Sequence, residues 1–266
     1  MDEKFSHDMH IFTEKVGAYL PEDAHKIIKH RYQIAAKLSE GKSALEVGVG
    51  QGFGMQSIAK SSSKYTGIEY SSENIAYINE IRSNYKIIQG DAHNMPFHDS
   101  EFQIINALAM IYYLDVDKFF KEAKRILSLD GTLFFCTSNK DAPGFVKAPF
   151  TTKYYSIPEL NRLLTSNGFE VKFHGSFARY EQYKSLEKFK VVIKNIVKSI
   201  INTLPYGKNI WRSMRNKHLG GLKKLPISID DIELDKPWES DFNALENTIN
   251  NSQYRIIYCI AKLKNK

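Results

Sequence analysis

The sequence predicts a doubly wound α/β fold built on a mainly parallel sheet. Short apolar segments alternate along the chain with longer segments whose apolar residues recur at helical spacing. Strands separated by helices form right-handed βαβ crossovers, which produce a parallel sheet with helices on both faces. A glycine-rich turn follows the first apolar segment, where sheets of this kind bind their ligands.

Seven segments are predicted to contain strands because they are rich in apolar, β-branched and aromatic residues. In chain order they lie within residues 43–47, 64–71, 85–91, 101–114, 132–139, 169–177 and 253–263. Two helices are expected within residues 5–40, and further helices over 54–62, 72–83, 115–128 and 156–168. Ser71 or Ser72 is expected to cap the helix over 72–83, and Ser156 the helix over 156–168.

This order of elements divides the chain into three parts. Residues 1–40 are expected to form an N-terminal helical cap, and residues 41–177 together with 251–266 the α/β domain. Residues 178–250 interrupt the alternation between the sixth and seventh strands, and we expect them to form a basic helical insertion.

The composition is that of a globular protein that keeps its thiols reduced. The chain has 266 residues, of which 42% are hydrophobic, enough for one sizeable core and a smaller appendage. It contains no apolar run long enough to span a membrane and no signal-peptide pattern. Cys136 and Cys259 lie in apolar segments without metal-ligand spacing, which indicates buried thiols and a cytoplasmic location.

Positive charge is concentrated in the insertion. Residues 178–226 contain twelve Lys or Arg and two acids, a net charge of +10, so the rest of the chain carries −3 of the overall +7. Within it, residues 184–204 form an amphipathic pattern with lysines outside the apolar stripe. This pattern fits a solvated helix packed over the domain, a site for an anionic acceptor, or peripheral contact with the inner face of a membrane. Nucleic acid is not an expected partner, because no binding module or interleaved aromatic pattern is present.

The glycine-rich turn indicates the ligand. The stretch Ala44–Gly54, "ALEVGVGQGFG", has Gly48, Gly50 and Gly52 at every second position, and no GxGxxG register fits it. Glu46 precedes the glycines, where it repels a diphosphate but suits a ligand with an ammonium group. An amino acid joined to a nucleoside meets these requirements, which points to S-adenosyl-L-methionine.

The turn resembles motif I of the class I S-adenosylmethionine-dependent methyltransferases. The resemblance continues through "GIEYSS", "GDAHNMPF" and "FQIINALAMIYYL" to "FFKEAKRILSLDGTLFF", across residues 40–175, although Gln103 replaces the usual acid after Phe102. It implies a Rossmann-like sheet of strand order 3-2-1-4-5-7-6, with N-terminal helices and a helical lid between strands six and seven. It also implies the cofactor-binding residues Glu46, Gly48, Gly50, Gly52, Glu69, Tyr70, Asp91, Ala92 and Asn106.

Each implied role has an alternative. By resemblance Glu69 accepts hydrogen bonds from the ribose hydroxyls, Asp91 and the amide of Ala92 contact the adenine, and Tyr70 stacks on it. Alternatively, Glu69 is a solvated carboxylate at a strand end, Asp91 a turn residue, and Tyr70 an exposed aromatic. Arg31 or Tyr32 is placed to reach the cofactor's carboxylate, or else lies in solvent or in the core.

The catalytic residues are less clearly indicated than the cofactor site. Methyl transfer depends mainly on alignment in a water-poor site, and a hydroxyl acceptor also needs a general base. Tyr112, Tyr113 and His93 are the candidates, with an aromatic wall and a structural histidine as the alternatives. The spacing of His25 and His30 does not suit metal ligands on one helical face, so no metal is expected.

The acceptor is expected to be a small molecule or glycan. The position of "NALA" lacks the Asn-Pro-Pro-Tyr signature of base and glutamine methylation, and no cysteine suits cytosine methylation. Looser resemblance to methyltransferases of surface-polysaccharide pathways favours O-methylation of a sugar, sugar-phosphate or nucleotide-sugar hydroxyl. The alternatives are N- or O-methylation of another secondary metabolite, and a membrane-associated scaffold that binds S-adenosylmethionine without catalysis.

Overall fold

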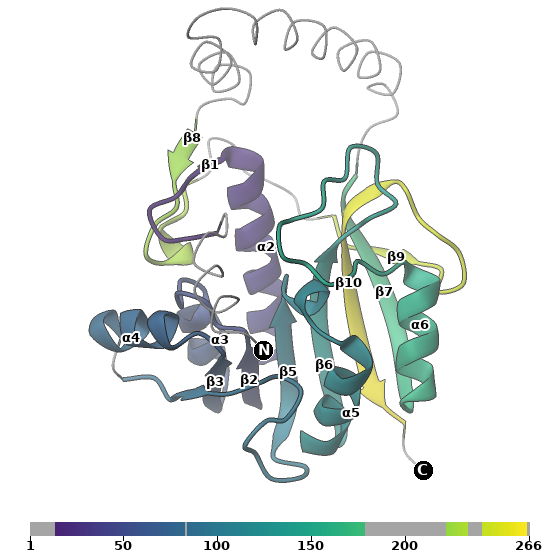
Figure 1. Cartoon of the computed structure of the whole chain (residues 1–266), viewed down its shortest axis with the longest axis horizontal. Helices are drawn as coiled ribbons and strands as arrows, with labels where there is room; N and C mark the ends of the chain where they lie inside the picture. The colour runs from purple at the N-terminus through teal and green to yellow at the C-terminus, as the bar shows by residue number, and fades with distance from the viewer. Residues whose placement is uncertain (1–13, 83, 179–221, 234–240, 265–266) are drawn as a thin grey trace, which may run out of the picture.

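A sheet of eight strands forms the centre of the protein (Figure 1). The computed structural model describes residues 14–82, 84–178, 222–233 and 241–264. The strand order is β4-β3-β2-β5-β6-β10-β7-β9. In chain order the strands are β2 (Ser43–Val47), β3 (Lys64–Glu69), β4 (Ile87–Gln89), β5 (Phe102–Leu108), β6 (Leu127–Ser138), β7 (Phe169–Ala178), β9 (Asn243–Leu245) and β10 (Tyr254–Leu263). The β4-β3-β2-β5-β6 pairs are parallel, whereas β10 is antiparallel to both of its neighbours.

The sheet differs from the predicted one at an edge and at one strand start. Numbered in chain order, the seven expected strands lie as 3-2-1-4-5-7-6, and β9 adds an eighth that was not expected. Because β9 comes from the 178–250 insertion and pairs with β7, part of that insertion belongs to the sheet. β6 begins before the predicted 132–139, since the turn at Asp130 (φ +61°) is accommodated within the strand.

Five helices lie close to their predicted positions. They are α2 (Glu22–Leu38), α3 (Met55–Ser61), α4 (Ser72–Ile81), α5 (Val116–Ile126) and α6 (Ile157–Ser166). The α4 cap is Ser71, whose hydroxyl accepts from the backbone N–H of Asn74 at 3.3 Å. Residues 14–21 contain no helix, so the first predicted N-terminal helix does not extend into the described part of the chain.

The helices divide between the two faces of the sheet. On one face α2 and α3 pack through Tyr32 and Ile58 against side chains that include Phe134. On the other face α5 and α6 pack through residues such as Phe119 and Leu160. Successive residues of a strand point to opposite faces, so the face of each strand residue decides whether it meets α2 and α3 or α5 and α6.

A two-stranded ribbon links the N-terminal segment to the insertion. β1 (Tyr19–Pro21) pairs with β8 (Leu222–Lys224), and Figure 1 shows the ribbon beside the start of α2. The chain after β8 packs over the glycine turn, because Ile229 of the short helix η3 (Ile229–Asp231) donates its N–H to the carbonyl of Phe53 at 2.9 Å. The cap and the insertion therefore meet above the first βα turn.

The predicted basic helix over 184–204 lies outside the described residues. Within the described part of the chain, no helix is long and apolar enough to cross a membrane.

Candidate active site

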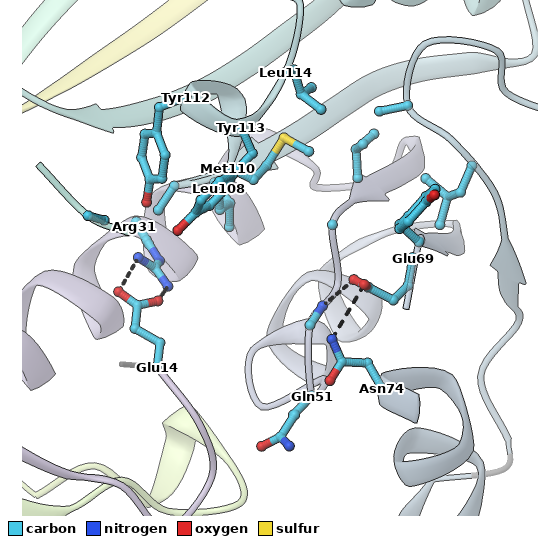
Figure 2. A pocket seen from close by; sticks show the side chains of 18 of the residues that line it. Glu14, Arg31, Gln51, Glu69, Asn74, Leu108, Met110, Tyr112, Tyr113 and Leu114 are labelled. Atoms are coloured by element: carbon cyan, nitrogen blue, oxygen red, sulfur yellow. Dashed lines mark hydrogen bonds and ion pairs between the residues drawn. The ribbon is translucent and has the colours of Figure 1, made fainter. Parts of the chain in front are cut away.

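A cavity of about 500 Å³ opens at the carboxyl ends of β2, β3, β4 and β5 (Figure 2). This is the edge at which doubly wound sheets bind ligands, and the volume is in the range of small-molecule sites. The wall includes eleven residues considered from the sequence: Arg31, Tyr32, Gly48, Gly50, Glu69, Tyr70, Asp91, Ala92, His93, Tyr112 and Tyr113. Glu46, Gly52 and Asn106 are not part of the wall.

The glycine turn has a backbone that other residues rarely adopt. Gly48, Gly50 and Gly52 have φ values of +75°, +61° and +72°, in the left-handed region that favours glycine. A Cβ atom at Gly50 would meet nothing within 4 Å, so this part of the turn faces open space. At Gly52, in contrast, a Cβ would lie 3.1 Å from Met55 Sδ, because this glycine packs against α3 and Ile78.

Glu69 joins the end of β3 to the glycine turn. One carboxylate oxygen accepts the backbone N–H of Gly50 at 2.8 Å, and the other accepts the N–H of Ser71 at 3.0 Å and an amide hydrogen of Asn74 at 3.4 Å. Glu69 is only 4% exposed, and burial raises the pKa of its carboxyl despite these hydrogen bonds. Its carboxylate lies on the cavity wall, where it can accept further hydrogen bonds from a ligand.

Asp91 and His93 form a fixed pair after β4. The carboxylate of Asp91 contacts His93 Nδ1 at 2.7 Å and accepts the His93 backbone N–H at 3.0 Å. His93 Nε2 accepts the backbone N–H of Asp115 at 3.1 Å. Both ring nitrogens are thus engaged, so the geometry argues against His93 as a general base and for its role in holding Asp91.

Glu46 lies behind the glycine turn, away from the cavity. Its side chain points to the α2 face, where Tyr32 donates to one carboxylate oxygen at 3.2 Å and Tyr65 to the other at 2.6 Å. It is 1% exposed, and burial raises the pKa of its carboxyl to about 7. This position differs from the one expected from the sequence, because the side chain of Glu46 points toward α2 and is not part of the cavity wall.

Asn106 also points to the α2 face. Its side-chain amide donates to the hydroxyl of Ser39 at 3.1 Å, and the residue is completely buried. It pairs with Glu46 across the β2–β5 ladder. The contact with the cofactor expected of Asn106 is therefore not supported by its placement.

Tyr112 and Tyr113 lie on the cavity wall in the short helix η2 (Ile111–Tyr113). Their rings are 4.7 Å apart between centroids, and Tyr112 also stacks on Tyr154 at 4.6 Å. Burial raises the pKa of both phenols above the ordinary value. A phenol with a raised pKa is rarely ionised at neutral pH, so the arrangement favours an aromatic wall over a base at this position.

The structure adds an ion pair that the sequence did not indicate. Arg31 of α2 is 4% exposed and forms a bidentate pair with Glu14, with Nη1 donating to Oε1 at 3.1 Å and Nη2 donating to Oε2. Burial opposes the charge on Arg31, but the attraction and hydrogen bonding of Glu14 outweigh it and keep its pKa high. Tyr32, the other residue considered for the cofactor's carboxylate, lines the cavity but donates its hydroxyl to Glu46.

A second cavity of about 240 Å³ adjoins the first. The two share five wall residues: Glu14, Arg31, Ala109, Tyr112 and Val146. The second extends over the ends of β6 and the start of β10, and its lining is mainly apolar or small. Arg255, paired with Asp23 at 3.2 Å, lies in its wall. Among the described residues, no three His, Cys, Asp or Glu side chains gather as a metal site would require.

Comparison with known proteins places most of the cavity wall within a recognised domain. Residues 45–135 match the family described as "Methyltransferase domain". This range contains the glycine turn, Glu69, Asp91 and the tyrosine pair Tyr112 and Tyr113.

Two curated relatives show similarity over part of the chain. A probable S-adenosylmethionine-dependent methyltransferase of Mycolicibacterium smegmatis is 29% identical over 155 residues, which cover 54% of this chain and 60% of that protein. A sterol 4-C-methyltransferase of Caenorhabditis elegans is 30% identical over 138 residues, which cover 49% of this chain and 41% of that protein. The chain spans about half the length of these relatives.

A solved structure supports the fold. A SAM-dependent methyltransferase from Archaeoglobus fulgidus matches with a TM-score of 0.57 over 98% of this chain and all of that chain, at 13% identity. At this identity the likeness shows only the fold, which is a Rossmann-like α/β fold with a mostly parallel central sheet.

Proposed function

We propose that this chain transfers a methyl group from S-adenosylmethionine to a small-molecule acceptor, because residues 45–135 match a methyltransferase domain and the chain is similar to a probable S-adenosylmethionine-dependent methyltransferase. The cofactor supplies an electrophilic methyl group carried on a sulfonium. The observation that carries the proposal is the junction of Gly50 and Glu69 on the wall of the large cavity, inside the matched domain.

The described residues fit this cofactor. The open space at Gly50 lets a ligand approach the backbone, where a Cβ would otherwise intrude. Beside it, Glu69 is the proposed acceptor for the two ribose hydroxyls, since a carboxylate takes both hydrogen bonds. Asp91, oriented by His93, and the backbone of Ala92 are the proposed contacts of the adenine. Tyr70, also on the wall, is the proposed aromatic neighbour of the base.

The second cavity is the proposed acceptor chamber. It shares Arg31, Ala109 and Tyr112 with the first cavity, so a ligand in one lies beside a ligand in the other. Ile27, Phe145 and Ile256 give it an apolar lining. Methyl transfer requires that water is excluded and that the two ligands are aligned. The apolar lining serves the first requirement, and the shared wall serves the second.

Two classes of acceptor are proposed, an anionic sugar derivative and a less polar molecule. The sugar or nucleotide-sugar hydroxyl predicted from the sequence is supported by the guanidinium group of Arg255 on the wall of the second cavity, which suits an anionic molecule. The apolar lining and the name of the sterol methyltransferase relative favour a less polar acceptor. Tyr112 and Glu14 do not favour either acceptor class by acting as a general base. The pKa of Tyr112 is raised, and Glu14 is paired with Arg31.

Methyl-labelled S-adenosylmethionine tests the proposal directly. The protein is incubated with it and with matched panels of nucleotide sugars, sugar phosphates and sterol-like alcohols, and S-adenosylhomocysteine and labelled product are measured. We expect turnover above background with one class, and loss of that turnover in Glu69→Ala. Tight binding of S-adenosylhomocysteine without turnover in any panel would favour the scaffold alternative.

A further inference from the structure

The second cavity, the proposed acceptor chamber, carries one positive charge that no group on its own wall compensates. Its charged wall residues are Glu14, Arg31 and Arg255. Glu14 and Arg31 neutralise each other through their bidentate pair. Arg255 lines the second cavity but not the first, and its partner Asp23 lines neither. The charge that a ligand meets in the acceptor chamber is therefore that of Arg255.

Arg255 is only loosely held by Asp23. Its Nη1 atom donates to Asp23 Oδ2 at 3.2 Å, and within the described ranges this is the one hydrogen bond that the guanidinium donates. The side chain of Asp23 is 66% exposed, and that of Arg255 is 35% exposed. Ion pairs in contact with solvent contribute little free energy, and a guanidinium has five hydrogen atoms to donate. A ligand can therefore use the remaining donors of Arg255 or take the place of Asp23.

The backbone that carries Arg255 is fixed by Asn139, which follows β6. The N–H of Asn139 donates to the Arg255 carbonyl at 2.9 Å. Its side-chain amide donates to the carbonyls of Asn251 at 2.6 Å and Tyr254 at 2.8 Å, and its side-chain oxygen accepts the N–H of Asp141 at 3.0 Å. Asn139 is also part of the chamber wall, but both ends of its side chain are used in these contacts. It therefore positions Arg255 and leaves the ligand to the guanidinium.

The rest of the acceptor chamber suits an uncharged part of a ligand. Ile27, Phe145 and Ile256 line it. The ring of Tyr154 joins two of its aromatic wall residues, because it stacks on Tyr112 at 4.6 Å and meets Phe145 edge-on at 4.7 Å between centroids. Apolar surface thus extends from Tyr112 on the shared wall to Phe145, which lines the second cavity alone.

We propose that Arg255 binds an anionic group of the acceptor, a carboxylate or a phosphate, and that the acceptor is an amphiphilic molecule with an apolar body. This inference rests on the proposed function. An anion on Arg255 leaves the shared wall to the group that receives the methyl, with the apolar body along Ile27 and Phe145. Asp23 competes with that anion for the guanidinium. The charge and the apolar lining of the chamber thus recognise different parts of one molecule.

Small anions with an apolar ring, and their uncharged counterparts, provide the test. Phenylacetate supplies a carboxylate and phenyl phosphate a phosphate, and phenylacetamide and benzyl alcohol are the counterparts. Calorimetric titration measures the binding of each probe to protein saturated with S-adenosylhomocysteine, for the wild type, Arg255→Gln and Asp23→Asn. The matched control is Arg162→Gln, since Arg162 is exposed on α6 and lines neither cavity.

We expect the wild-type protein to bind the anions about tenfold or more tightly than their counterparts, as a charged hydrogen bond predicts. Arg255→Gln should remove this preference. Asp23→Asn should increase it, because the competing carboxylate is gone, and Arg162→Gln should leave it unchanged. Binding of S-adenosylhomocysteine should stay within about twofold in every variant, which also shows that the variants are folded.

An unchanged preference in Arg255→Gln, equal wild-type affinity for anions and counterparts, or binding of none of the four probes would overturn the inference. Binding of S-adenosylhomocysteine would in each case leave the proposed function intact. A preference for one of the two anions that is lost in Arg255→Gln would support the inference and identify the acceptor's anionic group. Failure of the wild-type protein to bind S-adenosylhomocysteine would instead refute the proposed function, and the inference with it.

Discussion

The carboxylate of Glu69 accepts the backbone N–H of Gly50 at 2.8 Å, which ties the end of the second parallel strand to the turn after the first. The residues are 19 apart in the chain, and the β2–β3 ladder brings them together. A single side chain therefore both fixes the glycine turn and faces the ligand cavity.

The first prediction concerns this carboxylate. Glu69→Ala should weaken the binding of S-adenosylhomocysteine by about 1–3 kcal/mol, because charged hydrogen bonds to the ligand are lost. Calorimetric titration measures the change, with Glu80→Ala as the control, since Glu80 is exposed on α4 and lines neither cavity. Equal affinity of wild type and Glu69→Ala would refute the proposed ribose contact.

The second prediction is a pH dependence of stability. Burial raises the pKa of Glu46 to about 7 from an ordinary 4.5. An acid with a raised pKa in the folded state contributes stability that is fully present below about pH 4.5 and is lost as the pH rises through about 7. The free energy of unfolding of the wild-type protein should therefore fall by about 3 kcal/mol more over this window than that of Glu46→Gln.

Urea denaturation at a series of pH values provides this comparison. Wild type and Glu46→Gln should converge at low pH, where the carboxyl is protonated in both the folded and unfolded states. Parallel curves from pH 4 to 8 would show that Glu46 titrates normally, which would contradict the burial that raises the pKa of its carboxyl.

The third prediction concerns the packing of the glycine turn on α2. A Cβ atom at Gly54 would lie 2.2 Å from the ring of Tyr32, so Gly54→Ala should cost about 1–3 kcal/mol of stability through overpacking. In a Tyr32→Leu background the same change should cost less, because the ring is gone. Gly41→Ala, which places its Cβ in open space, should be additive with Tyr32→Leu.

Thermal or chemical unfolding of the single and double variants measures the coupling energy. Additivity of Gly54→Ala with Tyr32→Leu, within the error of the experiment, would contradict the close contact.

The fourth prediction concerns the two thiols. Burial raises the pKa of Cys136 to about 11 and that of Cys259 well above its ordinary value. Only a thiolate reacts readily, so neither thiol of the folded protein should react appreciably with a disulfide reagent at pH 8. Both should react once the protein is unfolded in denaturant, and rapid reaction of the folded protein would contradict their burial.

Most elements of the fold could be predicted because they have a strong apolar pattern and follow one another in regular alternation, whereas β9 has three residues and no distinct signal. The face of each strand residue was harder to predict. β2 and β5 are buried on both sides, so they lack the alternation that would have placed Glu46 and Asn106 against α2.

Contacts between residues that are far apart in the chain could not be predicted from the sequence. Glu14 and Arg31 meet because the N-terminal segment lies along the cavity wall, where hydrogen bonds to Gln51 and Leu225 hold it. No local spacing signals such a contact. The residues of the glycine turn and Glu69 were found because strand ends and their turns have fixed positions in a parallel sheet.

Calorimetric titration with S-adenosylhomocysteine, and with NAD as the matched nucleotide control, determines which ligand the cavity binds. We expect micromolar binding of S-adenosylhomocysteine and none of NAD. Binding of NAD in its place would contradict the assignment of the cavity and the proposed methyl transfer with it.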